Sequence, residues 1–254
     1  MKLQCISLYR VLFSLGLSLF SNQKTKQQSY QRFSKIENFT KQKGWLPESY
    51  FFIVRIIETE AYYGKGKAGI LSHSYHKNKS NSERFDSGII PGTVYMYFAH
   101  GGDSINFSCG NQGSAVLIKS GFPASNDPSM LQKMRHLNPG SGQAERSLDH
   151  LCKGQTLFCK SLGLKVREWD GKEMNPLKLR ILNNSPVEEI IQTTRLGISK
   201  GHSCNELLEY RYIDAEFVKK CTKNPLTVRN NPPNITKLRN NQSKISSQSH
   251  NIMS

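Results

Sequence analysis

The sequence predicts an α+β fold, namely a single mixed domain in which an antiparallel, hairpin-rich sheet is flanked by helices. Three observations lead to this class. Short apolar runs alternate with polar residues within residues 51–119, brief glycine turns separate several of these runs, and helical spacing begins only after residue 126. Such short connections join antiparallel strands, whereas parallel strands need a crossover of a dozen or more residues.

The predicted strands come early in this domain. Residues 51–62 form a long run rich in β-branched and aromatic side chains, as strands usually are. A second strand is expected at residues 93–99, where apolar residues alternate with tyrosines after a Pro-Gly turn. Two more are expected at residues 104–108 and 114–119, separated by a turn at residues 110–113. This close spacing predicts antiparallel hairpins.

Helices are predicted in the second half of the domain. Asp127 and the proline after it are typical of a helix start, and Asn138 follows the last apolar residue of that segment. Residues 148–162 carry leucine, cysteine and phenylalanine at helical spacing and end before a glycine, so a helix is expected there.

The last predicted elements lie between residues 177 and 191. Residues 177–182, LKLRIL, predict a strand. Residues 185–188, SPVE, have the form of a capping box with proline at the first helical position. We therefore expect a helix there, with Ile190 and Ile191 on its apolar face.

Composition divides the chain into three segments. Residues 1–50 form an atypical N-terminal segment, whose apolar run at residues 11–20 predicts a buried helix; that run resembles a short signal-peptide core but lacks a small-residue cleavage site. Residues 51–220 mix apolar and polar residues densely and are expected to form the main folded domain. Residues 221–254 are rich in Asn, Ser and Lys and predict a disordered basic tail.

Net charge and cysteine pattern narrow the class of protein. The formal net charge is +16, which favours nucleic acid or an anionic membrane surface as partner, although a basic ribosome-associated surface has the same charge. The 6 cysteines contain no C-x-x-C pair, which fits a reducing compartment. No stretch approaches the roughly 20 apolar residues that span a bilayer. His73 and His76 with Glu60 are weak candidates for a metal site.

Two carboxylates interrupt the apolar strand at residues 51–62. Alternation along a strand places Glu58, Glu60 and Tyr62 on one face. Carboxylates seldom sit in apolar strands unless they are paired or functional, so a buried acid in a basic chain suggests a hydrolytic base that acts on nucleic acid. Residues two apart on a strand are roughly 6.6–6.8 Å apart, a spacing that also permits a mechanism in which both carboxylates take part.

Four blocks of sequence together resemble one enzyme family. They are RIIETEAYYG with His73-Ser74, PGTVYMYFAHGGDSINFS at residues 91–108, GSAVLIK at residues 113–119, and TTRLGIS at residues 193–199. In this order they resemble the alkyladenine (3-methyladenine) DNA glycosylase family. The resemblance implies a mixed domain with an antiparallel sheet and a protruding hairpin. It also implies hydrolysis of the N-glycosidic bond of alkylated or deaminated purines, without metal or cofactor.

The same resemblance implies roles for individual residues. It assigns the activation of water to Glu60, the stacking of a flipped base to Tyr62 and Tyr97, and a hydrogen bond to the flipped nucleotide to His73. Asn106 matches a position that crowds the exocyclic amine of guanine, although it can equally satisfy turn backbone. Glu58 is then a structural carboxylate, for which we expect a partner such as Arg55 or Arg195.

Contacts with DNA are implied at three further positions. His100 matches the hairpin side chain that wedges into the minor groove, where relatives carry tyrosine, and Tyr97 or Phe98 can assist it. Lys119 stands where relatives usually carry arginine, and either cation can meet a phosphate or the pocket rim. Arg195 is expected to be an anchor, structural or to phosphate. Residues 152–156, CKGQT, depart from the usual glycine-proline loop of the family.

Two other functions remain open from the sequence. One is a non-catalytic DNA-binding or damage-sensing relative, and the other is a metal-dependent phosphodiesterase that uses Glu58, Glu60 and His73. For the leading hypothesis we expect double-stranded DNA with damaged purines as partner, a monomer without membrane contact, and an abasic product without strand cleavage. The expected location is the cytoplasm and nucleoid of a bacterium or the nucleus of a eukaryote.

Overall fold

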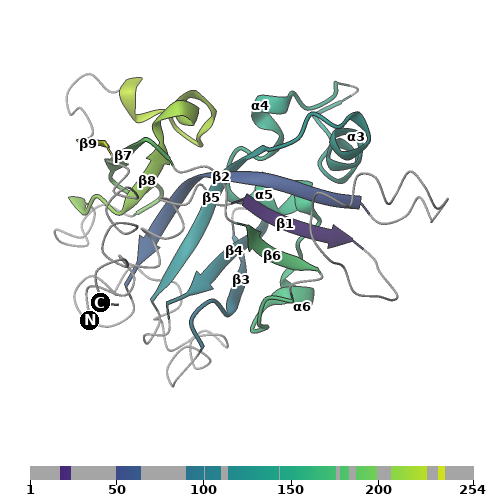
Figure 1. Cartoon of the computed structure of the whole chain (residues 1–254), viewed down its shortest axis with the longest axis horizontal. Helices are drawn as coiled ribbons and strands as arrows, with labels where there is room; N and C mark the ends of the chain where they lie inside the picture. Colours follow the sequence, from purple (N-terminus) through teal and green to yellow (C-terminus); the bar gives the residue numbers. More distant parts are fainter. Residues whose placement is uncertain are drawn as a thin grey trace, which may run out of the picture.

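The computed structural model shows one antiparallel sheet with short helices packed against it (Figure 1). It describes residues 18–23, 50–63, 90–99, 101–109, 114–142, 144–175, 178–182, 187–198, 207–227 and 234–237. Within these residues the sheet has 9 strands, and every pairing is antiparallel. The predicted α+β class is therefore confirmed.

The strands follow the order β3-β4-β5-β2-β8-β7-β9, and β1 joins β2 to β6 beside this path. Their bounds are β1 Ser18–Gln23, β2 Tyr50–Tyr62, β3 Val94–Ala99, β4 Gly102–Ser108, β5 Ala115–Pro123, β6 Leu179–Leu182, β7 Glu189–Thr193, β8 Arg211–Asp214 and β9 Asn234–Lys237. The four strands predicted from residue 51 to residue 119 are confirmed, as is the strand predicted at residues 177–182.

Strand β2 organises the sheet because three strands pair with it. One edge of β2 pairs with β5 along most of the length of β2. Its other edge pairs first with β1, at residues 50–55, and then with β8, at residues 58–60. The register with β5 becomes irregular between Ile56 and Thr59, where Glu58 lies opposite Ser120. Such irregularities bend a strand and redirect its side chains, and this one falls where the neighbour of β2 changes.

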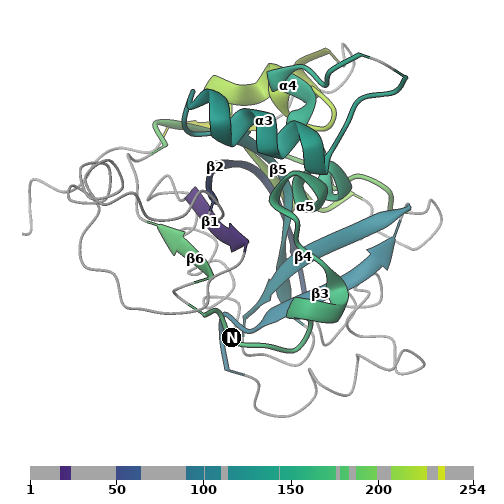
Figure 2. The same ribbon diagram turned by 90° about the vertical axis from the view of Figure 1, so that its right-hand side faces the viewer.

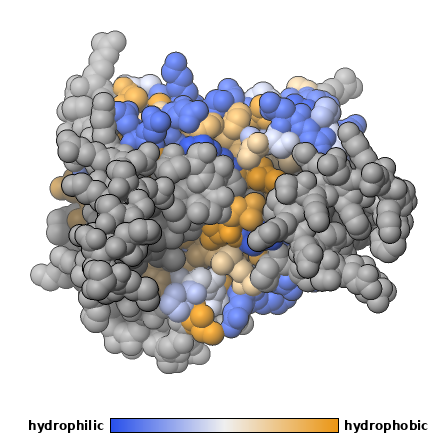
Figure 3. Space-filling model, in the orientation of Figure 1, coloured by the Kyte–Doolittle hydropathy of each residue, from blue (hydrophilic) through white to orange (hydrophobic). Residues whose placement is uncertain are grey.

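The helices gather at one end and one side of the sheet (Figures 1 and 2). Their bounds are α3 Pro128–Leu137, α4 Leu148–Leu151, α5 Gln155–Leu162 and α6 Val166–Trp169, followed by the 3-10 helices η5 Ala215–Lys220 and η6 Pro225–Thr227. The Asp127 side chain accepts from the backbone N–H of Ser129, so the predicted cap of α3 is confirmed. Hydrophilic side chains line the upper edge of the molecule above a narrow apolar strip (Figure 3).

The hydrophobic core lies on one face of the β3-β4-β5 sheet and continues around β2 to the helices. Alternate residues of the three strands face it, and Phe158, Cys159 and Leu162 of α5 join the same cluster. Gly121 permits the close approach of α5, since a Cβ there would lie 2.6 Å from a ring carbon of Phe158. The strand residues of this face are Val94, Met96, Ile105, Phe107, Val116 and Ile118.

Two predictions of helix were wrong. Residues 18–20, part of the apolar run expected to form a buried helix, belong to β1, because they pair with both β2 and β6. The capping-box pattern at residues 185–188 is followed by strand β7 instead of a helix. Ile190 and Ile191 belong to different apolar clusters, which requires neighbouring side chains to point in opposite directions, as in a strand.

The helix predicted at residues 148–162 is divided into α4 and α5. The division falls at Cys152, Lys153 and Gly154, and Gly154 has a φ of 93°, a left-handed conformation that is easy only for glycine. The Cys152 backbone oxygen accepts from Gly121 in β5. The break therefore brings the start of α5 against the sheet. Gln155 is the first residue of α5 and lies at this place.

The chain after residue 220 takes part in this packing. Cys221 is fully buried, the backbone N–H of Thr222 donates to Glu58, and β9 pairs with β7. The predicted boundary at residue 220 thus lies inside a packed segment. In the part of the chain that the structure describes, no helix has the length and apolar character needed to cross a membrane.

Candidate active site

The strand registers place the candidate residues of the sheet on one face. Glu60 lies opposite Leu117, Leu117 opposite Asn106, and Asn106 opposite Tyr95. Directly opposite residues of antiparallel strands share a face, so this row crosses four strands on the side away from the core. Tyr62, Tyr97 and Lys119 lie two residues along their strands from members of the row, and they therefore share its face.

Glu60 is the centre of this face. Its side chain has no exposed surface, and three donors surround the carboxylate. The Tyr62 hydroxyl donates to Oε2 at 2.8 Å, and the Lys119 ammonium lies 3.4 Å from the same oxygen. The backbone N–H of Leu196 donates to Oε1 at 2.9 Å. These contacts hold a buried negative charge in one orientation.

Tyr62 is held between Glu60 and Arg195. Burial, and then the negative charge of Glu60, raise the pKa of the Tyr62 phenol well above its ordinary value. The phenol is therefore neutral and donates a hydrogen bond to the carboxylate. The Arg195 guanidinium lies 4.7 Å from the centre of the Tyr62 ring, and it donates to the backbone oxygen of Ala61 at 3.2 Å. Arg195 itself is only 5 % exposed.

The β3-β4 hairpin supplies the other aromatic side chains. The rings of Tyr95 and Tyr97 are 5.6 Å apart. Burial, followed by the charge of Glu60, raises the pKa of Tyr97 to about 12. Asn106 is buried and donates its amide to the backbone oxygen of Tyr95. Phe98 differs from these residues because it is 69 % exposed near the end of the hairpin.

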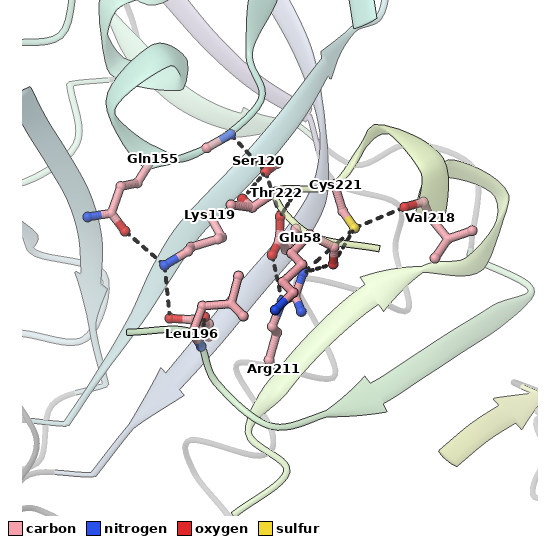
Figure 4. Close-up of polar contacts among 12 residues, drawn as sticks. Glu58, Lys119, Ser120, Gln155, Leu196, Arg211, Val218, Cys221 and Thr222 are labelled. Carbon is pink, nitrogen blue, oxygen red and sulfur yellow. Dashed lines mark hydrogen bonds and ion pairs between the residues drawn. The ribbon is translucent and has the colours of Figure 1, made fainter. Parts of the chain in front are cut away.

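Lys119 is almost buried, with 9 % of its surface exposed. Besides Glu60, it donates to the side-chain oxygen of Gln155 at 3.2 Å (Figure 4). Gln155 is the first residue of α5, and its amide nitrogen donates to Ser104 of β4 at 2.9 Å. A cation expected at the rim of the site is thus enclosed within it.

Glu58 belongs to a separate group of buried residues (Figure 4). Arg211 Nε donates to Glu58 Oε1 at 2.6 Å, and the other oxygen accepts from Ser120 Oγ at 2.6 Å and from the Thr222 backbone at 2.7 Å. The expected partners Arg55 and Arg195 were therefore wrong. Arg55 pairs instead with Asp214, at 2.9 Å, because β1 and β8 occupy different halves of the β2 edge.

Arg211 extends this second group to the segment after η5. It donates to the backbone oxygen of Lys223 at 2.6 Å and contacts the Cys221 sulfur at 3.6 Å. Burial, and then the charge of Glu58, raise the pKa of Cys221 to about 11. The thiol is therefore neutral and donates to the backbone oxygen of Val218 at 2.9 Å.

Several predicted site residues lie outside the described residues, namely His73, His76 and His100. Among the residues that the structure does describe, no group of three or more His, Cys, Asp or Glu side chains could hold a metal ion. The predicted site residues that the structure describes are Glu60, Tyr62, Tyr97, Asn106, Lys119 and Arg195.

Sequence reasoning missed three contributors to this site. The backbone N–H of Leu196 carries no side-chain signal, and only its place in the TTRLGIS block indicates that the segment approaches the acid. Arg211 is far from Glu58 in sequence and belongs to none of the four blocks. One feature of the sequence points weakly to Gln155: it lies in residues 152–156, which depart from the family pattern.

Comparison with known proteins gives the class of this chain. Residues 47–217 match the sequence pattern of the methylpurine-DNA glycosylases. This match places the chain among the DNA glycosylases, which are hydrolases that act on DNA with alkylated bases and serve DNA repair. The chain belongs to the methylpurine-DNA glycosylase family.

Individual relatives agree with this assignment. A Pseudomonas aeruginosa (strain UCBPP-PA14) protein named "Putative 3-methyladenine DNA glycosylase" is 47% identical over 177 residues, which cover 68% of this chain and 71% of the relative. A protein of the same name from Pseudomonas savastanoi pv. phaseolicola is 48% identical over 177 residues, covering 68% and 76%. One from Rhizobium johnstonii is 31% identical over 149 residues, covering 58% and 66%.

Proposed function

We propose that this protein removes alkylated or deaminated purines from double-stranded DNA by simple hydrolysis. The substrates are 3-methyladenine, 7-methylguanine and hypoxanthine-like bases, and the product is an abasic site in an uncut strand. Glu60 activates the attacking water. The observation that carries the proposal is the position of Glu60, a buried carboxylate in the same row as the hairpin tyrosines, with three donors fixing its orientation.

The contacts of Glu60 leave room for that water. A carboxylate offers about four lone-pair sites. Tyr62 and Lys119 both approach Oε2, whereas among the residues that the structure describes only Leu196 donates to Oε1. Oε1 can therefore accept a hydrogen bond from a water. Because Glu60 has no exposed surface, a water that bonds Oε1 is shielded from bulk solvent, and we propose that it enters together with the extruded nucleotide.

Bond changes at the sugar define the task of Glu60. The water oxygen forms a bond to the anomeric carbon, the glycosidic pair of electrons leaves with the purine, and the proton of the water passes to Glu60. A purine alkylated at N3 or N7 is cationic and departs as a neutral base, so it needs no proton donor. Hypoxanthine is neutral in the nucleotide and leaves as an anion, which takes up a proton from solvent. The negative charge of Glu60 also stabilises the positive charge that develops on the sugar.

Glu58 is a poor alternative to Glu60. Both of its oxygens accept hydrogen bonds of 2.6–2.7 Å, and one donor is an arginine that is only 2 % exposed. A carboxylate that took up a proton here would leave the Arg211 charge buried and unpaired, which costs several kcal/mol. We therefore assign Glu58 a structural role and the reaction to Glu60 alone.

Stacking on tyrosine rings favours a damaged, cationic base over a normal base. A cationic purine is attracted to an aromatic face by roughly 1 kcal/mol or more when both are desolvated. Arg195 already covers one face of Tyr62, so only the other face of that ring can meet a base. Tyr97 is then the principal stacking partner, and Asn106 stands beside it on the neighbouring strand. Since Lys119 and Arg195 are buried, we propose that both shape this base site and that phosphates are bound elsewhere.

The exposed end of the hairpin is the proposed contact with the duplex. Flipping a nucleotide out of the stack costs a few kcal/mol, and an inserted side chain can offset it. Phe98, at 69 % exposed, is an apolar ring available for this purpose, and it lies two residues before His100 in the sequence. The net charge of +16 supplies general attraction to the backbone. We propose that the protein acts as a monomer on chromosomal DNA, in the nucleoid or the nucleus.

Timed release of free purine from methylated duplex DNA tests this proposal, with EDTA present throughout. Wild-type protein should release base and leave heat- or alkali-labile abasic sites, without nicking the strand by itself. A protein that retains DNA but releases nothing would instead be a damage-binding relative. Activity that EDTA abolishes, together with strand cleavage, would indicate a phosphodiesterase.

A further inference from the structure

We propose that Gln155 is a positioning residue for this hydrolysis, because its amide holds the Lys119 ammonium beside Glu60. The inference rests on the proposed function of Glu60 and adds a residue that does not touch the substrate. Gln155 is 8 % exposed, and it lies at the start of α5, where the break after α4 brings the chain against the sheet.

The hydrogen bonds of Gln155 fix which way its amide faces. An ammonium can only donate, so the atom that faces Lys119 has to be the amide oxygen. The amide nitrogen then points to Ser104 Oγ, 2.9 Å away in β4. Both ends of the amide are therefore occupied, and Gln155 joins helix α5 to two neighbouring strands of the sheet.

Lys119 needs this second contact to remain in place. Its side chain has four rotatable bonds and a compact charge that any nearby acceptor can attract. The contact with Glu60 is long, 3.4 Å, and that with Gln155 is 3.2 Å. The ammonium is thus shared between a carboxylate and an amide. We infer that this sharing keeps the cation close enough to stabilise Glu60 through Oε2 while leaving Oε1 to Leu196 and the attacking water.

Lys119 and residues 152–156 are both places where this sequence departs from the pattern that the family resemblance implies. The two departures meet in the Lys119–Gln155 hydrogen bond. An arginine at position 119 could hold a carboxylate with two N–H groups of its planar fork and would need no amide beside it. Gln155 supplies in this chain the restraint that a single ammonium lacks.

A double-mutant cycle with Gln155→Met and Lys119→Met tests this inference, using single-turnover release of 7-methylguanine from methylated duplex. Methionine keeps the length of each side chain and removes its polar end. Gln155→Met should slow release about 10- to 100-fold, since small misplacements of an active group cost that much. Affinity for an abasic duplex should stay within about threefold, because Gln155 contacts no substrate. In the Lys119→Met background, Gln155→Met should change the rate less than about twofold.

Gln192→Met is the matched control, because the Gln192 amide bonds the backbone oxygen of Glu209 in another part of the sheet. It should leave the rate of release unchanged. A second variant tests rescue. Proline is tolerated at the first position of a helix, so Gln155→Pro should slow release while preserving α5, and adding Lys119→Arg should recover most of the lost rate.

The outcomes separate the inference from the function on which it rests. Wild-type protein that releases no base overturns both. Active wild-type protein with an unchanged rate in Gln155→Met overturns the inference alone. A third outcome is that Gln155→Met lowers the release rate equally whether position 119 is lysine or methionine, and also lowers the melting temperature. That result would show that Gln155 only stabilises the fold. Failure of Lys119→Arg to recover any rate would also contradict the positioning role.

Discussion

Glu58 and Glu60 lie two residues apart on the same strand, yet their surroundings differ in almost every respect. The donors around Glu58 are an arginine, a serine and a backbone N–H from the segment after η5, all within 2.6–2.7 Å. Glu60 has a phenol, an ammonium and one backbone N–H, at 2.8–3.4 Å. Among the described residues, each acid has one oxygen with a single donor. For Glu58 this donor is a buried arginine at 2.6 Å, whereas for Glu60 it is a neutral backbone N–H at 2.9 Å.

This difference shows how one strand can provide both a support and a reagent. Three strands and the segment after η5 meet at Glu58, so its charge joins elements that are distant in sequence. Glu60 faces aromatic side chains with neutral phenols and a cation shared with Gln155. The role of each acidic side chain therefore depends on the hydrogen-bond donors around it, since the residue type is glutamate in both cases.

Removing the charge of Glu60 should produce the largest effect. Glu60→Gln should lower single-turnover base release about 10²- to 10⁴-fold, the usual contribution of a general base. Affinity for duplex DNA with an abasic site should change little, because Glu60 acts on water. Release kinetics and a gel-shift titration would measure the two quantities. A variant with full activity, or one that folds but no longer binds DNA, would contradict the assignment.

The matching change at Glu58 should affect stability instead. Glu58→Gln leaves Arg211 buried without its partner, so the free energy of unfolding should fall by about 3–5 kcal/mol. Urea unfolding measures this, and the release rate per folded molecule should stay near that of the wild type. Glu145→Gln is the control, because Glu145 is exposed where it pairs with Arg135, and exposed pairs contribute about 0–1 kcal/mol. A stable Glu58→Gln protein that releases no base would reverse the roles of the two acids.

Phe98→Ala should have a smaller effect, confined to DNA binding. Loss of an aromatic contact with a base should cost about 1–3 kcal/mol of binding free energy. The loss should be greater on duplex containing an abasic site or ethenoadenine than on undamaged duplex, because only the former holds a flipped nucleotide. Leu226→Ala removes another exposed apolar side chain, in η6, and should bind as wild type does. Equal losses on both duplexes would show that Phe98 touches only the backbone.

The smallest effect concerns Tyr97 and alkaline pH. Burial, followed by the charge of Glu60, raises the pKa of Tyr97 in the folded protein to about 12, above the value of about 10 in an unfolded chain. The folded state therefore binds the phenolic proton more tightly, and this contribution to stability is complete below pH about 10 and is lost as the pH rises toward 12. In urea unfolding, Tyr97→Phe should lose less stability than the wild type between pH about 10 and about 12. An unchanged pH dependence would show that this phenol does not contribute.

Local patterns in the sequence predicted the strands and hairpins well, because alternation within residues 51–119 depends only on which side chains face the core. They misjudged residues 189–193, where a capping-box pattern preceded two isoleucines that pack on opposite sides of a strand. That outcome depends on β8 and β9, which pair with this segment, and no local window contains them.

The candidate site was predicted only as far as its own blocks of sequence extend. Glu60, Tyr62 and Tyr97 come together on one face of the sheet as alternation predicts. The partner of Glu58 did not follow, since Arg211 and Thr222 are 153 and 164 residues away along the chain. Burial of Lys119 and Arg195 also escaped prediction, because residues outside the four blocks, Gln155 and Tyr210, contribute to their surroundings.

The contacts of Thr222 and Lys223 with the Glu58 group have a practical consequence for anyone preparing this enzyme. The match to the family pattern ends at residue 217, but two of the hydrogen bonds that satisfy the buried acid and its arginine come from beyond that limit. A recombinant fragment cut where the relatives stop aligning would keep each residue proposed to act on the base and lose part of what holds them. The family match and the packed structure thus end at different residues in this molecule.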